Sequence, residues 1–155
     1  MSADLSSIIN YLQITDRITT GGQPTPGQIR LLQEAGCRVV INLALPTSLD
    51  ALPNEGELVT RLGMSYVHIP VVWEQPQLDD FKQFLVVMKA FEDRPVFVHC
   101  ARNMRVSCFV YLYRVIALHE PAEQGFTAIH HIWQPDDTWL RYMRSVEAHY
   151  INKGE

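Results

Sequence analysis

One short segment carries a cysteine, a histidine and two arginines in an order that could bind and attack a phosphate group. It reads His99-Cys100-Ala101-Arg102-Asn103-Met104-Arg105 and lies between a β-type apolar run and a long helix-type run. A tight loop that joins a strand to a helix points several backbone N–H groups at one spot, where the helix dipole adds positive potential. Because such a spot favours a dianion, we predict a phosphate-binding loop. Around Cys100 and Arg105 it comprises His99, Ala101, Arg102, Asn103, Met104, Val106 and Ser107.

Each side chain of this loop has an expected role. The positive field, with Arg102 and Arg105 nearby, should stabilise Cys100 as a thiolate, which is the nucleophilic form of cysteine. Arg105 could bind two equatorial phosphate oxygens with its planar fork and hold their charge during transfer. His99 is expected to donate hydrogen bonds that hold the loop, and Asn103 to adopt a left-handed backbone at its crest. The residues therefore predict a phosphomonoesterase in which Cys100 and Arg105 are catalytic.

The segment resembles the signature loop of the protein tyrosine and dual-specificity phosphatases. Those enzymes usually have five residues between Cys and Arg and then a Ser or Thr, whereas four residues separate Cys100 from Arg105 and Val106 follows. This pattern is more similar to a bacterial phosphatase-like family with a Cys-x4-Arg loop, sometimes fused to a β-lactamase-like metallohydrolase. Its members also carry a Gly-Gln-Pro motif and a Val-Ile-Asn-Leu strand, which stand here at residues 22–24 and 40–43. The similarity covers roughly residues 11 to 118.

The resemblance implies a general acid on a loop that precedes the strand leading to the cysteine. The matching loop spans residues 71–78, and Glu74 is its only carboxylate, so Glu74 is the expected acid. Loss of a general acid typically lowers the rate by a factor of about 10²–10⁴. Four other carboxylates remain candidates, although each is expected at a helix start, where acidic residues stabilise the dipole. They are Asp79, Asp80, Asp136 and Asp137.

Two other functions fit the same loop. A sulfurtransferase similar to rhodanese would use a short loop opened by a cysteine to carry a persulfide. A phosphate-binding domain without hydrolysis would fit the shortened loop, with Val106 where Ser or Thr is expected. The residues leave the substrate open among phosphotyrosine, phosphoserine, a nucleotide and a lipid head group.

Strand-like and helix-like segments alternate along the chain. Strands are predicted over residues 11–19, 37–43, 65–70 and 95–99, and helices over 26–35, 55–62, 78–91, 105–118, 122–131 and 138–152. The alternation predicts an α/β fold with a central, mostly parallel sheet of four to five strands flanked by helices. The resemblance implies the cysteine-dependent phosphatase fold. Ligands in such sheets bind at the carboxyl ends of strands, which is where Cys100 lies.

Composition and charge narrow the partners. The chain has 155 residues, of which 47% are apolar and 19% charged, so we expect one globular domain over residues 1–155. The net charge is −4 and no Lys/Arg-rich tract occurs, so a nucleic-acid partner is not expected. Neither a secretory leader nor an apolar run of the roughly 20 residues that span a bilayer is expected. We therefore expect a cytoplasmic protein, without a membrane partner, that acts on a phosphorylated protein or small molecule.

The cysteines indicate a reducing compartment. Cys37, Cys100 and Cys108 form an odd set without a C-x-x-C spacing, which argues against disulfides and against a zinc site. Cys108 lies in an apolar helical run and Cys37 follows a helix-ending glycine, so both are expected to be small core residues. The predicted chemistry requires no metal and no organic cofactor.

Overall fold

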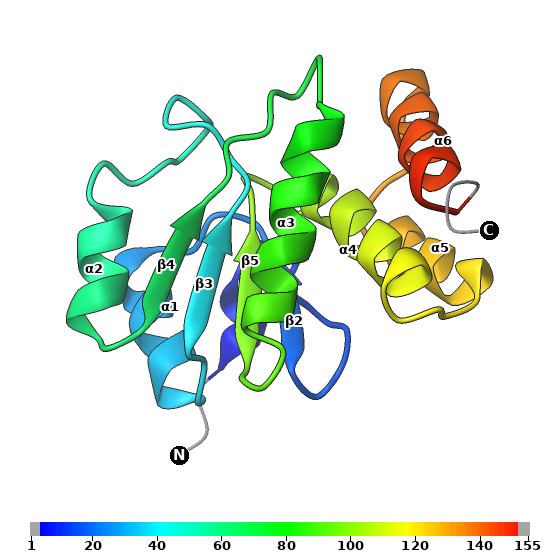
Figure 1. Ribbon diagram of the computed structural model, residues 1–155. Helices are drawn as coiled ribbons and strands as arrows, with labels where there is room; N and C mark the ends of the chain where they lie inside the picture. The colour runs from blue at the N-terminus through cyan, green and yellow to red at the C-terminus, as the bar shows by residue number, and fades with distance from the viewer. Residues whose placement is uncertain (1–3, 152–155) are drawn as a thin grey trace.

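The computed structural model describes residues 4–151 and contains a five-stranded sheet with helices on both faces (Figure 1). The strands are β1 (Leu12–Gln13), β2 (Ile18–Gly21), β3 (Val39–Asn42), β4 (Ser65–His68) and β5 (Val96–His99). Their spatial order is β1-β2-β5-β3-β4, and only the β1–β2 pair is antiparallel. The prediction of a mostly parallel sheet of four to five strands is confirmed.

Two layers of helices cover the sheet. The first described element is the short 3-10 helix η1 (Leu5–Ser7). Helices α1 (Pro26–Glu34) and α2 (Glu55–Arg61) lie on one face of the sheet (Figure 1). Helices α3 (Leu78–Ala90) and α4 (Met104–Ile116) lie on the other face. Helices α5 (Ala122–His130) and α6 (Asp137–Ile151) pack against α4. Successive strand residues point to opposite faces. Accordingly, Val39 and Ile41 join the core beneath α3 and α4, whereas Val40 joins the core beneath α1 and α2.

The helices form where local signals predict them. At the start of α1, Thr25 Oγ1 accepts from Gln28 N at 3.2 Å and Gln28 Oε1 accepts from Thr25 N at 3.0 Å, with Pro26 as the first helical residue. Gly36, with φ of 97°, follows the helix. The predicted end of the last helix, at position 152, lies outside the described residues. None of the helices within residues 4–151 is long and apolar enough to cross a membrane.

The predicted single strand over residues 11–19 is wrong, because this segment is a hairpin of β1 and β2. The turn between them is held by Thr15, whose Oγ1 accepts from Arg17 N at 3.1 Å and from Ile18 N at 3.0 Å. Ile14 N also donates to Ile18 O at 2.9 Å. A threonine hydroxyl can thus hold backbone N–H groups in a turn, although the residue type itself favours strands.

Candidate active site

Cys100 lies at the carboxyl edge of the sheet, directly after the central strand β5. The last residue of that strand, His99, pairs in register with Gly21 at the end of β2 and with Asn42 at the end of β3. Beyond this level, Cys100 N donates to Gly21 O at 3.4 Å. The side chain of Cys100 is almost fully buried. The predicted position of the cysteine at a strand end is confirmed.

The loop after Cys100 is held by its carbonyl groups. Three successive carbonyls accept from three different segments, namely Cys100 O from His99 Nδ1 (3.1 Å), Ala101 O from Gln23 N (3.0 Å) and Arg102 O from Asn10 Nδ2 (3.0 Å). No peptide bond within residues 4–151 is cis, and the N–H of a trans peptide points opposite to its C=O. The next three N–H groups, on Ala101, Arg102 and Asn103, therefore point away from these donors.

The start of α4 adds further donors. Asn103 is the residue before the helix, and its φ of 68° confirms the predicted left-handed backbone. Its side chain makes no capping hydrogen bond with any of the described residues. The first backbone bond of α4 runs from Ser107 N to Asn103 O at 2.9 Å, so the N–H groups of residues 104–106 have no acceptor within the helix itself. This helix end is suited to an anion.

Cys100 and Arg105 line one cleft. The cleft has a volume of about 190 Å³, and its other lining residues are Trp73, Ala101, Arg102 and Met104. One guanidinium nitrogen of Arg105 donates to Val71 O at 2.9 Å, and the side chain is only 6% exposed. Val71 follows β4, so the guanidinium is fixed between the cysteine loop and the loop that begins at Val71. Arg102, in contrast, is exposed at the rim.

Four residues of the predicted loop do not line the cleft, namely His99, Asn103, Val106 and Ser107. His99, Asn103 and Val106 are fully buried. The hydroxyl of Ser107 donates to Met104 O at 2.6 Å and accepts from Trp133 Nε1 at 3.0 Å, so it is used within α4 and by the segment after α5. The structure therefore brings five of the predicted residues to the cleft: Cys100, Ala101, Arg102, Met104 and Arg105.

The candidate acids lie at three places along the chain: in the loop after β4, at the start of α3 and at the start of α6. Glu74 is exposed and directly follows Trp73, which lines the cleft. Asp80 accepts from Gln77 N and Asp136 from Trp139 N, both at 2.9 Å, as predicted for carboxylates at helix starts. Burial raises the pKa of Asp80. Asp79 accepts from the side chain of Gln83 at 3.0 Å, and Asp137 is the first residue of α6.

Three tryptophans hold the loop that carries Glu74. The ring centroid of Trp73 lies 5.3 Å from that of Trp133 and 5.7 Å from that of Trp139. Trp139 Nε1 also donates to Trp73 O at 3.0 Å. Two segments far along the chain thus fix the cleft wall. Sequence reasoning missed this cluster because no local periodicity relates position 73 to positions 133 and 139.

A buried polar chain beneath the loop was also missed. His99 Nε2 lies 2.6 Å from Glu55 Oε2, and Gln23 Nε2 donates to Glu55 Oε1 at 2.7 Å. The side chains of His99 and Glu55 are 0% and 3% exposed. Burial would raise the pKa of Glu55, but the hydrogen bond and charge of His99, with Gln23, bring it below its usual range. The Gly-Gln-Pro motif, which contains Gln23, was the signal in the sequence that could have indicated this buried hydrogen-bond network.

Gly22 of the same motif lets the backbone approach the loop. Its N–H donates to Ile9 O at 2.6 Å, and it faces Arg102 in an isolated β-bridge. A Cβ atom at this position would lie 2.5 Å from Ala101 O. A residue without a side chain is therefore required here, and the motif serves the loop rather than the chain turn alone.

The two other cysteines belong to the cores, as predicted. Cys108 is fully buried, and burial raises its pKa to about 12. Cys37 is 8% exposed, and burial raises its pKa to about 11. Both thiols are free and protonated at neutral pH.

The chain is similar to known phosphatase families in sequence and in structure. The model of a family described as "DSP-PTPase phosphatase fused to NAD+ kinase" matches residues 9–141. The DUF442 protein of Shewanella putrefaciens CN-32, described as a candidate phosphatase, is 37% identical, with a TM-score of 0.85 over 94% of this chain and 96% of that one. No curated protein matches the chain in sequence.

Two more distant structures share the fold. A variant of P. aeruginosa TpbA in complex with pTyr is 15% identical, with a TM-score of 0.75 over 100% of this chain and 95% of that one. The core catalytic domain of the PP-IP phosphatase SIW14 from S. cerevisiae is 12% identical, with a TM-score of 0.77 over 94% and 90%. The implied cysteine-dependent phosphatase fold is thereby confirmed.

Proposed function

This chain belongs to the family of DSP-PTPase phosphatases fused to NAD+ kinase, and from that membership we propose that it hydrolyses phosphate monoesters through a phosphocysteine intermediate. It is a phosphatase of the tyrosine and dual-specificity type. The nucleophile of the proposed reaction is Cys100, Arg105 binds the phosphoryl oxygens, and Glu74 is the acid. Neither a metal nor an organic cofactor is required by these roles.

In the first step the Cys100 thiolate attacks phosphorus, so that an S–P bond forms and the P–O bond to the leaving group breaks. Protonated Glu74 gives its proton to the leaving oxygen, and the alcohol or phenol departs neutral. The guanidinium of Arg105 and the loop N–H groups hold the equatorial oxygens. In the second step water attacks phosphorus, the S–P bond breaks, and Glu74 takes the proton of the water. Inorganic phosphate and the thiolate result.

The shared cleft of Cys100 and Arg105 carries this proposal. The guanidinium is fixed by Val71 O, the loop carbonyls are turned toward their three donors, and the first N–H groups of α4 have no acceptor within the helix. An anion in this cleft would meet the loop donors, a planar guanidinium and a helix dipole together.

Hydrolysis of phenyl phosphate by wild type, Cys100→Ser and Cys37→Ser tests the nucleophile. Cys37 lies in the other core, so its serine variant is the matched control and is expected to keep wild-type turnover. Loss of turnover in Cys100→Ser alone supports the proposal, and equal turnover in all three removes Cys100 as the nucleophile. Tight binding of inorganic phosphate with no turnover by wild type would favour a binding domain. Sulfur transfer from thiosulfate to cyanide that exceeds phosphatase turnover would favour the rhodanese-like alternative.

Glu74 is proposed as the acid because it is the carboxylate next to Trp73, which lines the cleft. In Glu74→Gln, hydrolysis of an alkyl phosphate should fall by about 10²–10⁴, while a nitrophenyl phosphate, whose leaving group needs no proton, should lose much less. Asp79→Asn and Asp136→Asn are the controls. If either of them gives this pattern and Glu74→Gln does not, the acid is that aspartate.

A phosphorylated protein or small molecule is the proposed substrate, without a nucleic-acid or membrane partner. A reducing, cytoplasmic compartment would keep the proposed nucleophile reduced. The family description names NAD+ kinase as the fused partner, and fusion to a β-lactamase-like metallohydrolase stays a prediction from the resemblance.

A further inference from the structure

Both ring nitrogens of His99 face acceptor oxygens. Nδ1 lies 3.1 Å from Cys100 O, and Nε2 lies 2.6 Å from Glu55 Oε2. A backbone carbonyl can only accept, so Nδ1 must carry a proton. The state of Nε2 therefore depends on whether Glu55 is ionised.

The surroundings of Glu55 favour its ionised form. The oxygen that does not face His99, Oε1, accepts from Gln23 Nε2 at 2.7 Å, and a hydrogen bond of this kind favours the charged carboxylate. Two titratable groups of β4 also face it. Positive charge at His68 acts to lower the pKa of Glu55, and Tyr66 stays neutral because burial, together with Glu55, raises its pKa to about 12 despite the hydrogen bond from Asn42. Phe97, which stacks on the His99 ring with centroids 5.8 Å apart, carries no charge.

We propose that His99 is an imidazolium, doubly protonated and paired with the Glu55 carboxylate, and that Glu55 is the positioning residue that keeps it so. This inference rests on the proposed function only in taking the 100–105 loop as catalytic. The charged ring gives Cys100 O a stronger hydrogen bond than a neutral ring would. It thereby fixes the first peptide of the loop, whose N–H points the opposite way. Glu55, at the start of α2, thereby helps to set the shape of the loop between β5 and α4.

Nitrogen-15 NMR of histidine-labelled full chain tests the protonation directly. In wild type both ring nitrogens of His99 should show the shifts of protonated nitrogen at neutral pH, whereas in Glu55→Gln one should become unprotonated. The His99 signals are assigned by their absence from His99→Asn, or by the slow exchange of buried ring protons where that variant does not fold. Glu57→Gln, on the same helix but exposed and paired with Arg61, is the matched control and should leave the spectrum unchanged. A neutral ring in wild type overturns the inference.

Kinetics separate this inference from the proposed function. In Glu55→Gln kcat for phenyl phosphate should fall by about tenfold, the effect of one charged hydrogen bond, with Glu57→Gln unchanged. An unchanged kcat in Glu55→Gln overturns the positioning role even if the ring is charged. A wild type without turnover but with a doubly protonated ring would sink the phosphatase proposal and leave the imidazolium standing.

The side chain of Asn103, the residue before α4, has one buried oxygen, Oδ1. The Asn103 carboxamide donates through Nδ2 to Asn10 O at 2.8 Å and to Thr20 Oγ1 at 3.0 Å. This orientation is required, because Asn10 O can only accept. The other end of the amide, Oδ1, is buried and has no hydrogen-bond partner among residues 4–151.

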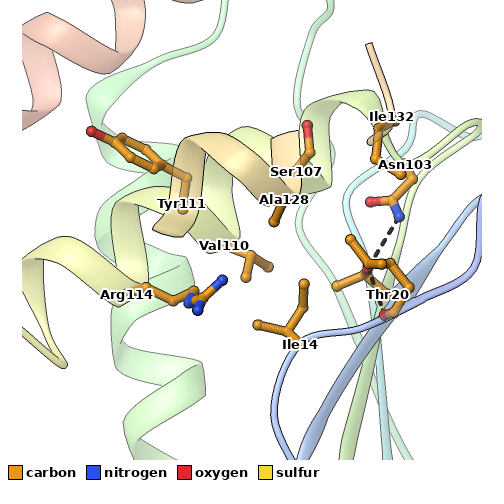
Figure 2. A pocket seen from close by; sticks show the side chains of 11 residues that line it. Ile14, Thr20, Asn103, Ser107, Val110, Tyr111, Arg114, Ala128 and Ile132 are labelled. Atoms are coloured by element: carbon orange, nitrogen blue, oxygen red, sulfur yellow. Dashed lines mark hydrogen bonds between the residues drawn. The ribbon is translucent and has the colours of Figure 1, made fainter. Parts of the chain in front are cut away.

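That oxygen points into a cavity between β2, α4 and α5, away from Thr20 (Figure 2). The cavity offers about 10 Å³, close to the least space that holds one water. Thr20 and Ser107 are polar residues of its lining, and Val110, Ala128 and Ile132 bring apolar atoms. We infer that one ordered water binds here and donates to Asn103 Oδ1, on the side of the loop opposite the cleft.

A high-resolution crystal structure tests the site. We expect a density peak about 2.8 Å from Asn103 Oδ1 in each of two crystal forms. In solution, a long-lived water should give NOEs to the methyl group of Ala128, while that of Ala122, which is exposed on the same helix, is the internal control. An empty cavity, or an Oδ1 that turns to a protein donor, overturns the inference.

Discussion

Arg105 differs from a lysine mainly in the shape of its donor group. One guanidinium nitrogen is occupied by Val71 O at 2.9 Å, and a planar fork can bind that carbonyl and an anion together. In Arg105→Lys we therefore expect kcat/KM for phenyl phosphate to fall by about 10²–10³, with the fold retained. Arg102→Lys is the control, because Arg102 is exposed at the rim, and it should lose less than about tenfold. Equal losses would mean that net charge, not fork geometry, holds the phosphate.

Gly22 is the residue whose smallness the loop requires. An alanine there would bring its Cβ to 2.5 Å from Ala101 O, and this contact is with backbone, which cannot swing aside. Gly22→Ala should therefore lower kcat/KM by at least about tenfold and the free energy of unfolding by about 1–3 kcal/mol. Gly27→Ala is the control. It lies exposed in α1 with nothing closer than 4.0 Å, so alanine should raise stability slightly and leave activity alone. Thermal unfolding and steady-state kinetics on both variants measure this.

At the scale of elements, the turn between α5 and α6 supports the loop after β4. Trp133 packs on Trp73 with centroids 5.3 Å apart and donates to Ser107 Oγ at 3.0 Å, so it joins the cleft wall to α4. Trp133→Ala should lower kcat/KM by about tenfold and stability by about 1–3 kcal/mol, because Trp73 loses its support. Trp133→Phe keeps the ring and should recover most of the activity. If both variants match wild type in kinetics, the tryptophan cluster is structural only.

Elements with local signals could be predicted from the sequence, and those that depend on distant contacts could not. Thr25 and Pro26 define the start of α1 through bonds within four residues, and the left-handed backbone of Asn103 follows from its position before a helix. The hairpin was missed because the Thr15 hydroxyl competes with strand propensity. Glu55 was interpreted only as part of a helix, since its partner His99 lies 44 residues away.

At the scale of the whole molecule, the buried hydrogen-bond network of Gln23, Glu55 and His99 joins α2 to the end of the central strand β5. Glu55 begins α2 on one face, and His99 ends β5 directly before the loop that leads into α4. Removing one partner of a buried charged pair leaves the other charge uncompensated, so the cost is larger than for an exposed ion pair. The exposed pair of Arg61 and Glu57 should contribute little by comparison.

The buried network of Gln23, Glu55 and His99 should make the stability of the folded protein depend on pH in the acid range. The pKa of Glu55 is lowered in the folded protein, by His99 and Gln23 acting against burial, so its contribution is fully present above the pKa of an unfolded glutamate. It is lost as pH falls through the lowered folded value, because protonation then removes the acceptor of His99. Urea unfolding from pH 7 down to pH 3 should show wild-type stability falling below about pH 4.3. Glu55→Gln should begin lower, by about 1–3 kcal/mol at pH 7, and fall less steeply, whereas Glu57→Gln should follow wild type. Parallel curves for wild type and Glu55→Gln would show that Glu55 does not govern acid stability.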